Sequence, residues 1–221
     1  MKHFLRLAIL ITLFFKVQST VWAQSTPEKK YELVFLAGTI QPILLQGWNV
    51  EVDFYTPKMV FNYSHGFSLE LESKTGTTVG AAKEQHLAFH LPYSTGFGIG
   101  YRLHKYFDVR FEPKLHRFEV YYDGTNRRLQ ENQVTNYSTV TLGVGVYFRW
   151  KPFEKQDNFL RGIFTSTSLR YWQNVYSSLE GGEVSYENKV TGENATHKTA
   201  NIGMANTPFL FNIGIGYSIE F

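Results

Sequence analysis

The last stretch of the chain, residues 206–221, restricts the possible folds more than any other. It reads NTPFLFNIGIGYSIEF, in which every second residue from Phe209 to Phe221 is apolar and those between Asn212 and Glu220 are polar or glycine. Successive side chains of a strand point to opposite sides, so the pattern predicts a strand with one apolar face. Such a strand would aggregate at an open edge in water. A closed antiparallel barrel leaves no edge and turns the apolar face toward lipid, so we predict an all-β transmembrane barrel.

The N-terminus has the features of a cleavable signal peptide. Lys2 and Arg6 precede an apolar run at 7–15, and Ala23 offers the small residue that cleavage requires. The run is too short to cross a membrane as a helix, which needs about 20 apolar residues. We therefore predict a signal peptide at 1–23, a short N-terminal segment at 24–30 and one barrel domain at 31–221.

Charge and cysteine content exclude several classes of function. The chain has 22 Lys and Arg against 19 Asp and Glu, and removal of Lys2, Arg6 and Lys16 with the signal peptide leaves 19 of each. Such a balance gives no reason to expect a nucleic-acid partner. The absence of cysteine excludes disulfides, thiolate metal sites and a catalytic thiol. Aromatic residues make up 17% of the chain, which suits interfacial girdles, although a soluble β-sandwich is the alternative.

Seven further segments resemble the last one, and their spacing follows a rule. The eight predicted strands cover 31–40, 47–55, 58–72, 85–103, 106–122, 136–151, 159–176 and 206–221. Short connections at 56–57, 104–105 and 152–158 alternate with long ones at 73–84, 123–135 and 177–205. Outer-membrane barrels have short periplasmic turns and long outside loops, so the long connections are expected outside. The short connection 41–46 departs from this rule.

The inward faces combine charges with glycine. Charged residues of both signs point inward by alternation, and nine form the predicted interior charge network: Glu51, Asp53, Arg102, Asp108, Arg110, Glu112, Lys114, Arg149 and Glu220. Glu70, Lys151 and Arg170 share this inward parity. Buried charges persist when they are paired, and eight strands leave little bore, so we predict a plugged lumen. A narrow channel is the alternative. Inward glycines in the GxG segments that begin at Gly96, Gly143 and Gly214 are expected to give room to long inward side chains.

Histidine and serine suggest a catalytic alternative. Ser64 precedes His65, and His90 and Ser94 share the predicted inward face of one strand. A serine nucleophile needs a base within hydrogen-bond reach and an acid that orients the base, and no motif here sets these distances. His86 and His90 have the spacing of a helix face, which on a strand predicts no metal site. We therefore expect no catalytic, cofactor or metal residues, with a lipid-modifying acyl hydrolase or transferase as the alternative.

The longest connection, 177–205, contains two polar, β-prone arms around the turn at 191–194. It predicts a hairpin above the membrane or a solvated loop. An exposed hairpin edge can bind a partner by strand addition, so an extracellular partner is possible here.

These segments, the signal peptide and the terminal aromatic residue resemble small bacterial outer-membrane barrels of the OmpA/OmpX type over residues 31–221, in a Bacteroidota-like version. The resemblance implies a monomer in outer-membrane lipid with a structural or surface-interaction role. It also implies recognition of Gly216, Tyr217, Ile219 and Phe221 by the barrel-assembly machinery. Because the chain stops at Phe221, we expect no peptidoglycan-binding domain after the barrel.

Overall fold

The computed structural model describes residues 31–78 and 80–221, of which Tyr31–Phe221 form one compact unit. The predicted signal peptide and the segment 24–30 lie outside the described residues. No helix in the described part of the chain has the length and apolar character needed to cross a membrane.

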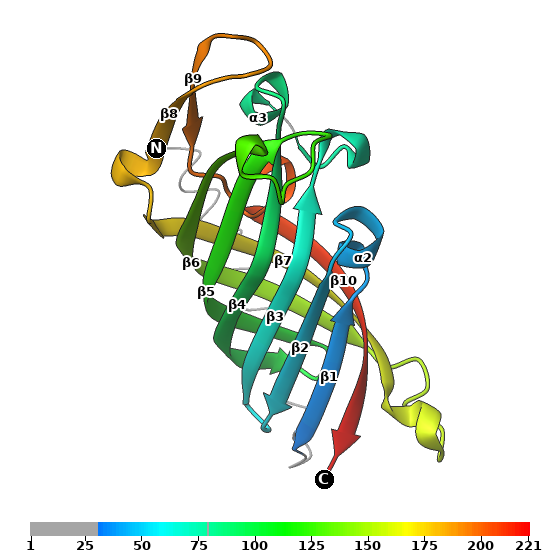
Figure 1. The fold of residues 1–221 in the computed structure, drawn as a ribbon. Coiled ribbons are helices and arrows are strands. Elements are labelled where there is room, and N and C mark those ends of the chain that lie inside the picture. Colours follow the sequence, from blue (N-terminus) through cyan, green and yellow to red (C-terminus); the bar gives the residue numbers. More distant parts are fainter. Residues whose placement is uncertain (1–30, 79) are drawn as a thin grey trace, which may run out of the picture. The chain divides into compact units, whose positions relative to one another are not determined.

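Eight antiparallel strands close into a barrel, as the sequence predicts (Figure 1). The order around the barrel is β1-β10-β7-β6-β5-β4-β3-β2. The bounds are β1 Glu32–Gly38, β2 Trp48–Tyr55, β3 Met59–Leu71, β4 Leu87–His104, β5 Phe107–Tyr122, β6 Gln133–Trp150, β7 Ile163–Ser177 and β10 Phe209–Glu220. The last strand pairs with the first from Glu32 opposite Glu220 to Gly38 opposite Gly214, which closes the sheet.

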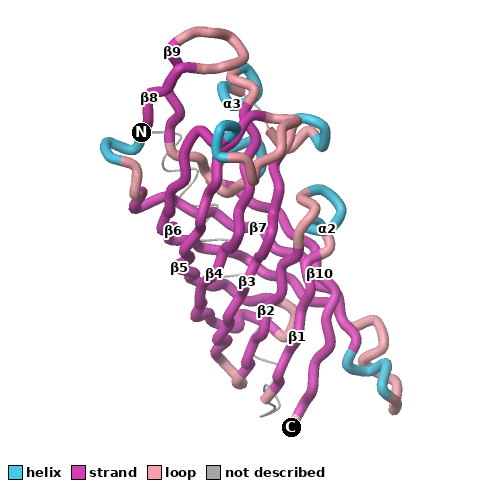
Figure 2. Tube along the Cα trace, viewed as in Figure 1, coloured by secondary structure: helices cyan, strands magenta, loops and turns pink. Residues whose placement is uncertain are grey.

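Short elements occupy the connections (Figure 2). Helix α2 (Ile40–Leu44) fills the connection after β1, and helix α3 (Ala81–Glu84) precedes β4. A separate two-stranded hairpin, β8 (Glu183–Glu187) with β9 (Asn194–Lys198), lies in the longest connection. Single 3-10 turns span Ser73–Thr75, Gln130–Asn132, Phe159–Gly162, Glu180–Gly182 and Met204–Asn206. We call the end of the barrel with this hairpin the hairpin end and the end with Tyr31 and Phe221 the terminal end.

The start of β7 differs from the prediction more than that of any other barrel strand. The sequence places its start at residue 159, but Phe159–Gly162 forms a 3-10 turn and β7 begins at Ile163. The side chain of Asn158 accepts the backbone N–H of Leu160 at 2.9 Å and so caps this turn. The connection 151–162 at the terminal end is therefore longer than the short turn that was predicted.

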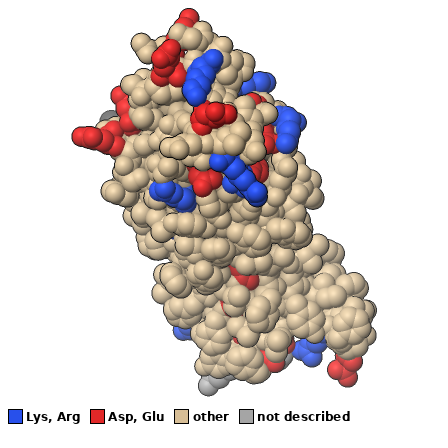
Figure 3. Space-filling view, in the orientation of Figure 1, with Lys and Arg blue, Asp and Glu red and all other residues tan. Residues whose placement is uncertain are grey.

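The barrel exterior is a broad apolar band. Outward side chains such as Phe97, Val144 and Ile215 are 68%, 52% and 54% exposed. Figure 3 shows Lys, Arg, Asp and Glu gathered toward the two ends of this face, with few charged atoms between them. Soluble monomers rarely expose an apolar patch larger than about 600 Å², so this surface suits a nonpolar solvent.

Near the hairpin end, β3 and β4 each change which of their alternate residues face the lumen and which face outward. On β4, Ser94 faces the lumen. The pairing of β4 with β5 is irregular between His90 and Ser94. Within this irregular stretch Leu91, which has the opposite parity to Ser94, belongs to the interior cluster. In β3 the reversal occurs at Ser68, whose φ is 53°. A bulge re-aims side chains in this way. Glu70 and His90, predicted to point inward, therefore point outward, because simple alternation does not anticipate an irregular residue.

β5 makes the same change through its sequence alone. Its inward residues turn from polar to apolar between His116 and Phe118, and its outward residues turn from apolar to charged between Leu115 and Arg117. Beyond this level the barrel has apolar side chains inside and polar ones outside, as a water-soluble barrel does. We call this part, with residues 177–205 packed on it, the extension.

Candidate functional site

Arg110 is the centre of the ion pairs inside the barrel. Its guanidinium lies 2.6 Å from Glu51 Oε1, 2.6 Å from Asp108 Oδ1 and 3.1 Å from Asp53 Oδ2. Arg170 reaches the second oxygen of Glu51 at 3.4 Å. These carboxylate and guanidinium groups thus belong to one network, in which the bonds to Arg110 are short and charge-assisted.

Glu112 and Lys114 lie nearer the hairpin end of the lumen. The Tyr147 hydroxyl donates to Glu112 Oε2 at 2.6 Å, and Asn62 Nδ2 donates to Oε1 at 3.3 Å. The Lys114 ammonium donates to the Ser64 hydroxyl. Polar partners from several strands thus satisfy these two charges, as burial requires.

A second charge group lies at the terminal end. Glu32 Oε2 is 3.1 Å from both Arg149 Nη1 and Lys151 Nζ, and Glu32 Oε1 is 3.5 Å from Arg102 Nη2. Lys151 also contacts Glu220 Oε1 at 2.8 Å. The structure therefore divides the nine predicted network residues: Arg102, Arg149 and Glu220 lie here, and the other six lie deeper.

Side chains fill the barrel at the level of Arg110. Glu51, Arg110 and Glu112 are 1%, 2% and 0% exposed. A water-filled bore through this level would leave the groups that line it exposed. The side chains of Glu51, Arg110 and Glu112 are therefore shielded from water at this level.

Several inward glycines adjoin long side chains of the next strand. A Cβ on Gly100 would lie 2.7 Å from Arg110 Cγ, and one on Gly145 would lie 3.2 Å from Arg170 Cγ. A Cβ on Gly96 would overlap the Lys114 side chain, and one on Gly143 would overlap Trp172. Glycine at these positions leaves the space that the interior side chains occupy.

The serine and histidine pairs considered from the sequence do not form. Ser64 contacts Lys114, whereas His65 points outward between the rings of Tyr63 and Phe67. Their side chains lie on opposite faces of β3, since adjacent residues of a strand point apart. This pair has no catalytic geometry.

Ser94 and His90 are also separated, because the irregularity in β4 lies between them. Ser94 Oγ instead lies 2.8 Å from His116 Nδ1, and Thr141 Oγ1 lies 2.9 Å from His116 Nε2. His116 is 0% exposed. No carboxylate contacts it among the described residues, so this group lacks both access and an orienting acid. No three His, Asp or Glu side chains within 31–78 and 80–221 are arranged to hold a metal ion.

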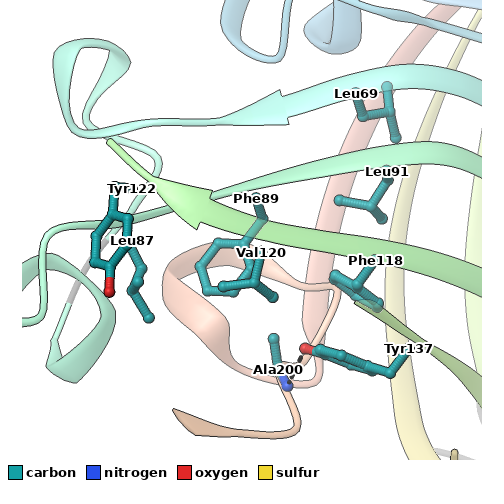
Figure 4. Packing of buried hydrophobic residues seen from close by; sticks show 9 residues of the cluster. All are labelled: Leu69, Leu87, Phe89, Leu91, Phe118, Val120, Tyr122, Tyr137 and Ala200. Atoms are coloured by element: carbon teal, nitrogen blue, oxygen red, sulfur yellow. Dashed lines mark hydrogen bonds between the residues drawn. The ribbon is translucent and has the colours of Figure 1, made fainter. Parts of the chain in front are cut away.

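The connection 177–205 packs on the hairpin end of the barrel through an apolar cluster (Figure 4). Phe89, Phe118 and Tyr137 belong to this cluster with Ala200 from the connection. The Tyr137 hydroxyl accepts the Ala200 N–H at 3.0 Å and lies 3.2 Å from His197 Nε2. The segment 177–205 therefore has a fixed hairpin with its own buried contacts, in place of the solvated loop that was the alternative.

Two polar anchors add to this packing. The Tyr122 hydroxyl accepts the Lys189 N–H at 3.0 Å and donates to the Glu187 carbonyl at 3.2 Å. Asn188 Nδ2 donates to the Gln85 carbonyl at 2.9 Å. In the hairpin itself, burial lowers the pKa of His197 to about 4, so this imidazole is neutral at neutral pH.

The predicted assembly-signal residues lie at the terminal end of β10. Tyr217, Ile219 and Phe221 point outward. Gly216 faces the lumen, where a Cβ would lie 2.6 Å from the Phe164 ring. Their recognition by the assembly machinery stays a prediction.

Sequence reasoning missed three participants in the interior. Glu32 receives three cations, and Tyr55 and Tyr147 bond to the central charges. The signal for Glu32 was its parity with Val34 and Leu36, which also face inward. These apolar neighbours concealed the polar use of that face, and alternation alone does not show which inward tyrosines bond to a charge.

No family model and no curated protein matches the chain. Three solved structures are similar in fold. Ail, the attachment invasion locus protein of Yersinia pestis, is 10% identical over 87% of this chain and 99% of its own, with a TM-score of 0.39. A major outer membrane protein from Thermus thermophilus is 11% identical over 87% and 98%, with a TM-score of 0.43. Neisserial surface protein A is 11% identical over 88% and 98%, with a TM-score of 0.33. At these values the similarity says nothing about activity or partners.

Proposed function

We propose that this chain is a monomeric, non-conducting barrel of the bacterial outer membrane that presents the β8–β9 hairpin to a partner outside the cell. The observation that carries the proposal is the reversal of polarity along the barrel. The band has its apolar residues on the outside, which suits a lipid environment. The extension has its apolar residues on the inside, which suits water. The Bacteroidota-like origin suggested by the sequence stays an untested expectation.

The two ends of the barrel support the orientation. The tight turns between β2 and β3 and between β4 and β5 lie at the terminal end, and the extension lies at the other (Figure 1). Outer-membrane barrels keep short turns in the periplasm and long connections outside. The hairpin is therefore assigned to the cell surface, where its docked position would present a fixed set of side chains to a partner. Closure of β1 on β10 leaves no barrel edge for self-association, which supports a monomer.

The filled layer around Arg110 supports a closed lumen over a narrow channel. Three measurements test the proposal. The protein should fractionate with outer membranes and migrate differently on gels before and after heating, as folded barrels do. In planar bilayers it should show no steady conductance. Recovery in the soluble periplasm would exclude the barrel's membrane location, and discrete open steps would favour the channel.

A further inference from the structure

Three side chains from neighbouring strands form a chain of hydrogen bonds on the outer surface of the barrel. Ser68 Oγ on β3 lies 3.4 Å from His90 Nε2 on β4, and His90 Nδ1 lies 2.7 Å from Glu119 Oε2 on β5. The reversal in β3 and β4 makes this possible, because it turns His90 outward beside Glu119.

One tautomer of His90 gives the three residues a catalytic order. With its proton on Nδ1, His90 donates to the Glu119 carboxylate, which only accepts hydrogen bonds, and its Nε2 lone pair faces the Ser68 hydroxyl. This is the order of nucleophile, base and orienting acid. The Ser68–His90 distance is long for a hydrogen bond, as is common in sites without substrate.

Burial and backbone conformation set the three residues apart from an ordinary surface cluster. His90 is 5% exposed, whereas Ser68 is open to the exterior. Ser68 is one of few non-glycine residues with positive φ among those described, at 53°. A positive φ is strained at a residue with a side chain, and such strain often accompanies function.

Three charged side chains surround His90: Glu70, Glu119 and Arg127. Glu70 Oε1 lies 3.8 Å from Nε2, and Glu119 contacts Nδ1. Arg127 holds both acids, with Nε 3.1 Å from Glu70 and Nη1 3.5 Å from Glu119, and its Nη1 lies 3.0 Å from His90 Nδ1.

The position of the site indicates the class of substrate. Ser68 lies where the exterior changes from the apolar band to the charged extension. Phe67 and its β2 partner Trp48 are 39% and 52% exposed on the apolar side. Glu70 and Arg127 lie on the charged side. An acyl chain along the two aromatic rings and a polar group toward Arg127 would place an ester carbonyl near Ser68.

We propose that Ser68 and His90 are catalytic residues, with Glu119 as their positioning residue, of a hydrolase for long-chain carboxylic esters at the outer membrane surface. As Ser68 Oγ bonds to the ester carbonyl carbon, His90 Nε2 takes the hydroxyl proton. The ester C–O bond breaks, the alcohol leaves with that proton, and the acyl group stays on Ser68. Water then gives a proton to His90 while its hydroxyl attacks the acyl carbon. Ser68 regains the proton and a fatty acid is released.

The test uses the full protein folded in detergent micelles, with p-nitrophenyl palmitate as substrate and a fluorophosphonate as a serine-directed probe. The wild type should hydrolyse the ester and carry the probe on Ser68, as mapped by peptide mass spectrometry. Ser68→Ala and His90→Gln should each lower the rate by at least about a hundredfold. Glu119→Gln should lower kcat and leave KM unchanged. A variant that had lost its structure would not change kcat alone.

Ser185→Ala in β8 is the matched control and should keep the wild-type rate. Heat-dependent gel mobility checks that every variant is a folded barrel. The proposal is overturned if the folded wild type neither hydrolyses the palmitate ester nor labels at Ser68, or if Ser68→Ala and Ser185→Ala are equally active. Faster hydrolysis of p-nitrophenyl acetate than of the palmitate would overturn the long-chain specificity. These outcomes are independent of whether the barrel conducts or binds a surface partner.

Discussion

Arg110 forms buried ion pairs, whereas Arg161 forms an exposed one. Arg110→Met would leave Glu51, Asp53 and Asp108 buried without their shared cation, so we expect a loss of about 3–5 kcal/mol in the free energy of unfolding. Arg161 contacts Glu220 at 3.2 Å, but its side chain is 46% exposed. Arg161→Met should cost less than about 1 kcal/mol. Urea unfolding in lipid vesicles, followed by tryptophan fluorescence, measures both, and equal stabilities would contradict the buried role of Arg110.

Val144 tests the apolar band at a single residue. It points outward in the middle of β6 and is 52% exposed. Val144→Arg should cost about 2–4 kcal/mol or block insertion, because a cation at the middle of the hydrocarbon layer is poorly solvated. Glu131→Arg, in an exposed turn before β6, is the control and should leave the same unfolding curve nearly unchanged. If both variants unfold alike, Val144 does not face lipid.

At the residue scale, alternation predicts which face a charge occupies but not its partner. Arg110 on β5 and Glu51 on β2 are separated by two strands in the barrel order and meet across the lumen. Their pairing depends on the closure of the whole barrel, and no local sequence pattern predicts which side chains closure brings together. The Ser68–His90 contact was missed for another reason, since it requires the irregularity that turns His90 outward.

At the element scale, the buried His197 links the hairpin to pH. Its folded pKa of about 4 lies below the usual value of 6.5, so protons favour the undocked state. Docking is fully stable above about pH 6.5 and should weaken as pH falls toward 4. Hydrogen exchange of the β8 and β9 amides should therefore report more frequent opening in this range, after correction for the intrinsic pH dependence of exchange. His197→Phe is the control, in which this pH dependence should disappear. If the wild type and the variant share the same pH dependence, His197 does not control docking.

The existence and order of the strands followed from the sequence, because the period of two is strong in β2, β6 and β10. Strand ends were less predictable. Residues 159–162 contain apolar side chains that continue the strand pattern, but the Asn158 cap holds them in a 3-10 turn. The hairpin was one of two alternatives that its β-prone arms allowed, beside a solvated loop. Its docking was not predicted, since the cluster around Phe89 joins residues that are more than 100 positions apart.

At the scale of the whole molecule, closure depends on the pairing of the two terminal strands. Phe221 exchanges backbone hydrogen bonds with Tyr31 at 3.0 and 3.1 Å and exposes its ring beyond β10. Deletion of Phe221 should lower the amount of folded barrel in outer membranes more than it lowers the stability of the barrel once formed. Phe209→Ala, at the other end of the same strand, should assemble normally. Normal surface levels of the deletion variant would show that Phe221 is not part of an assembly signal.

Labelling of single cysteines in intact cells tests the orientation and the membrane location of the barrel, because the chain contains no cysteine. Glu193→Cys is in the exposed turn of the hairpin, and Lys155→Cys is in the exposed connection at the terminal end. A maleimide that does not cross membranes should label Glu193→Cys in intact cells and Lys155→Cys only after lysis. Labelling of Lys155→Cys but not Glu193→Cys in intact cells would contradict the orientation. Protection of both, with recovery in the soluble periplasm, would contradict the outer-membrane barrel itself.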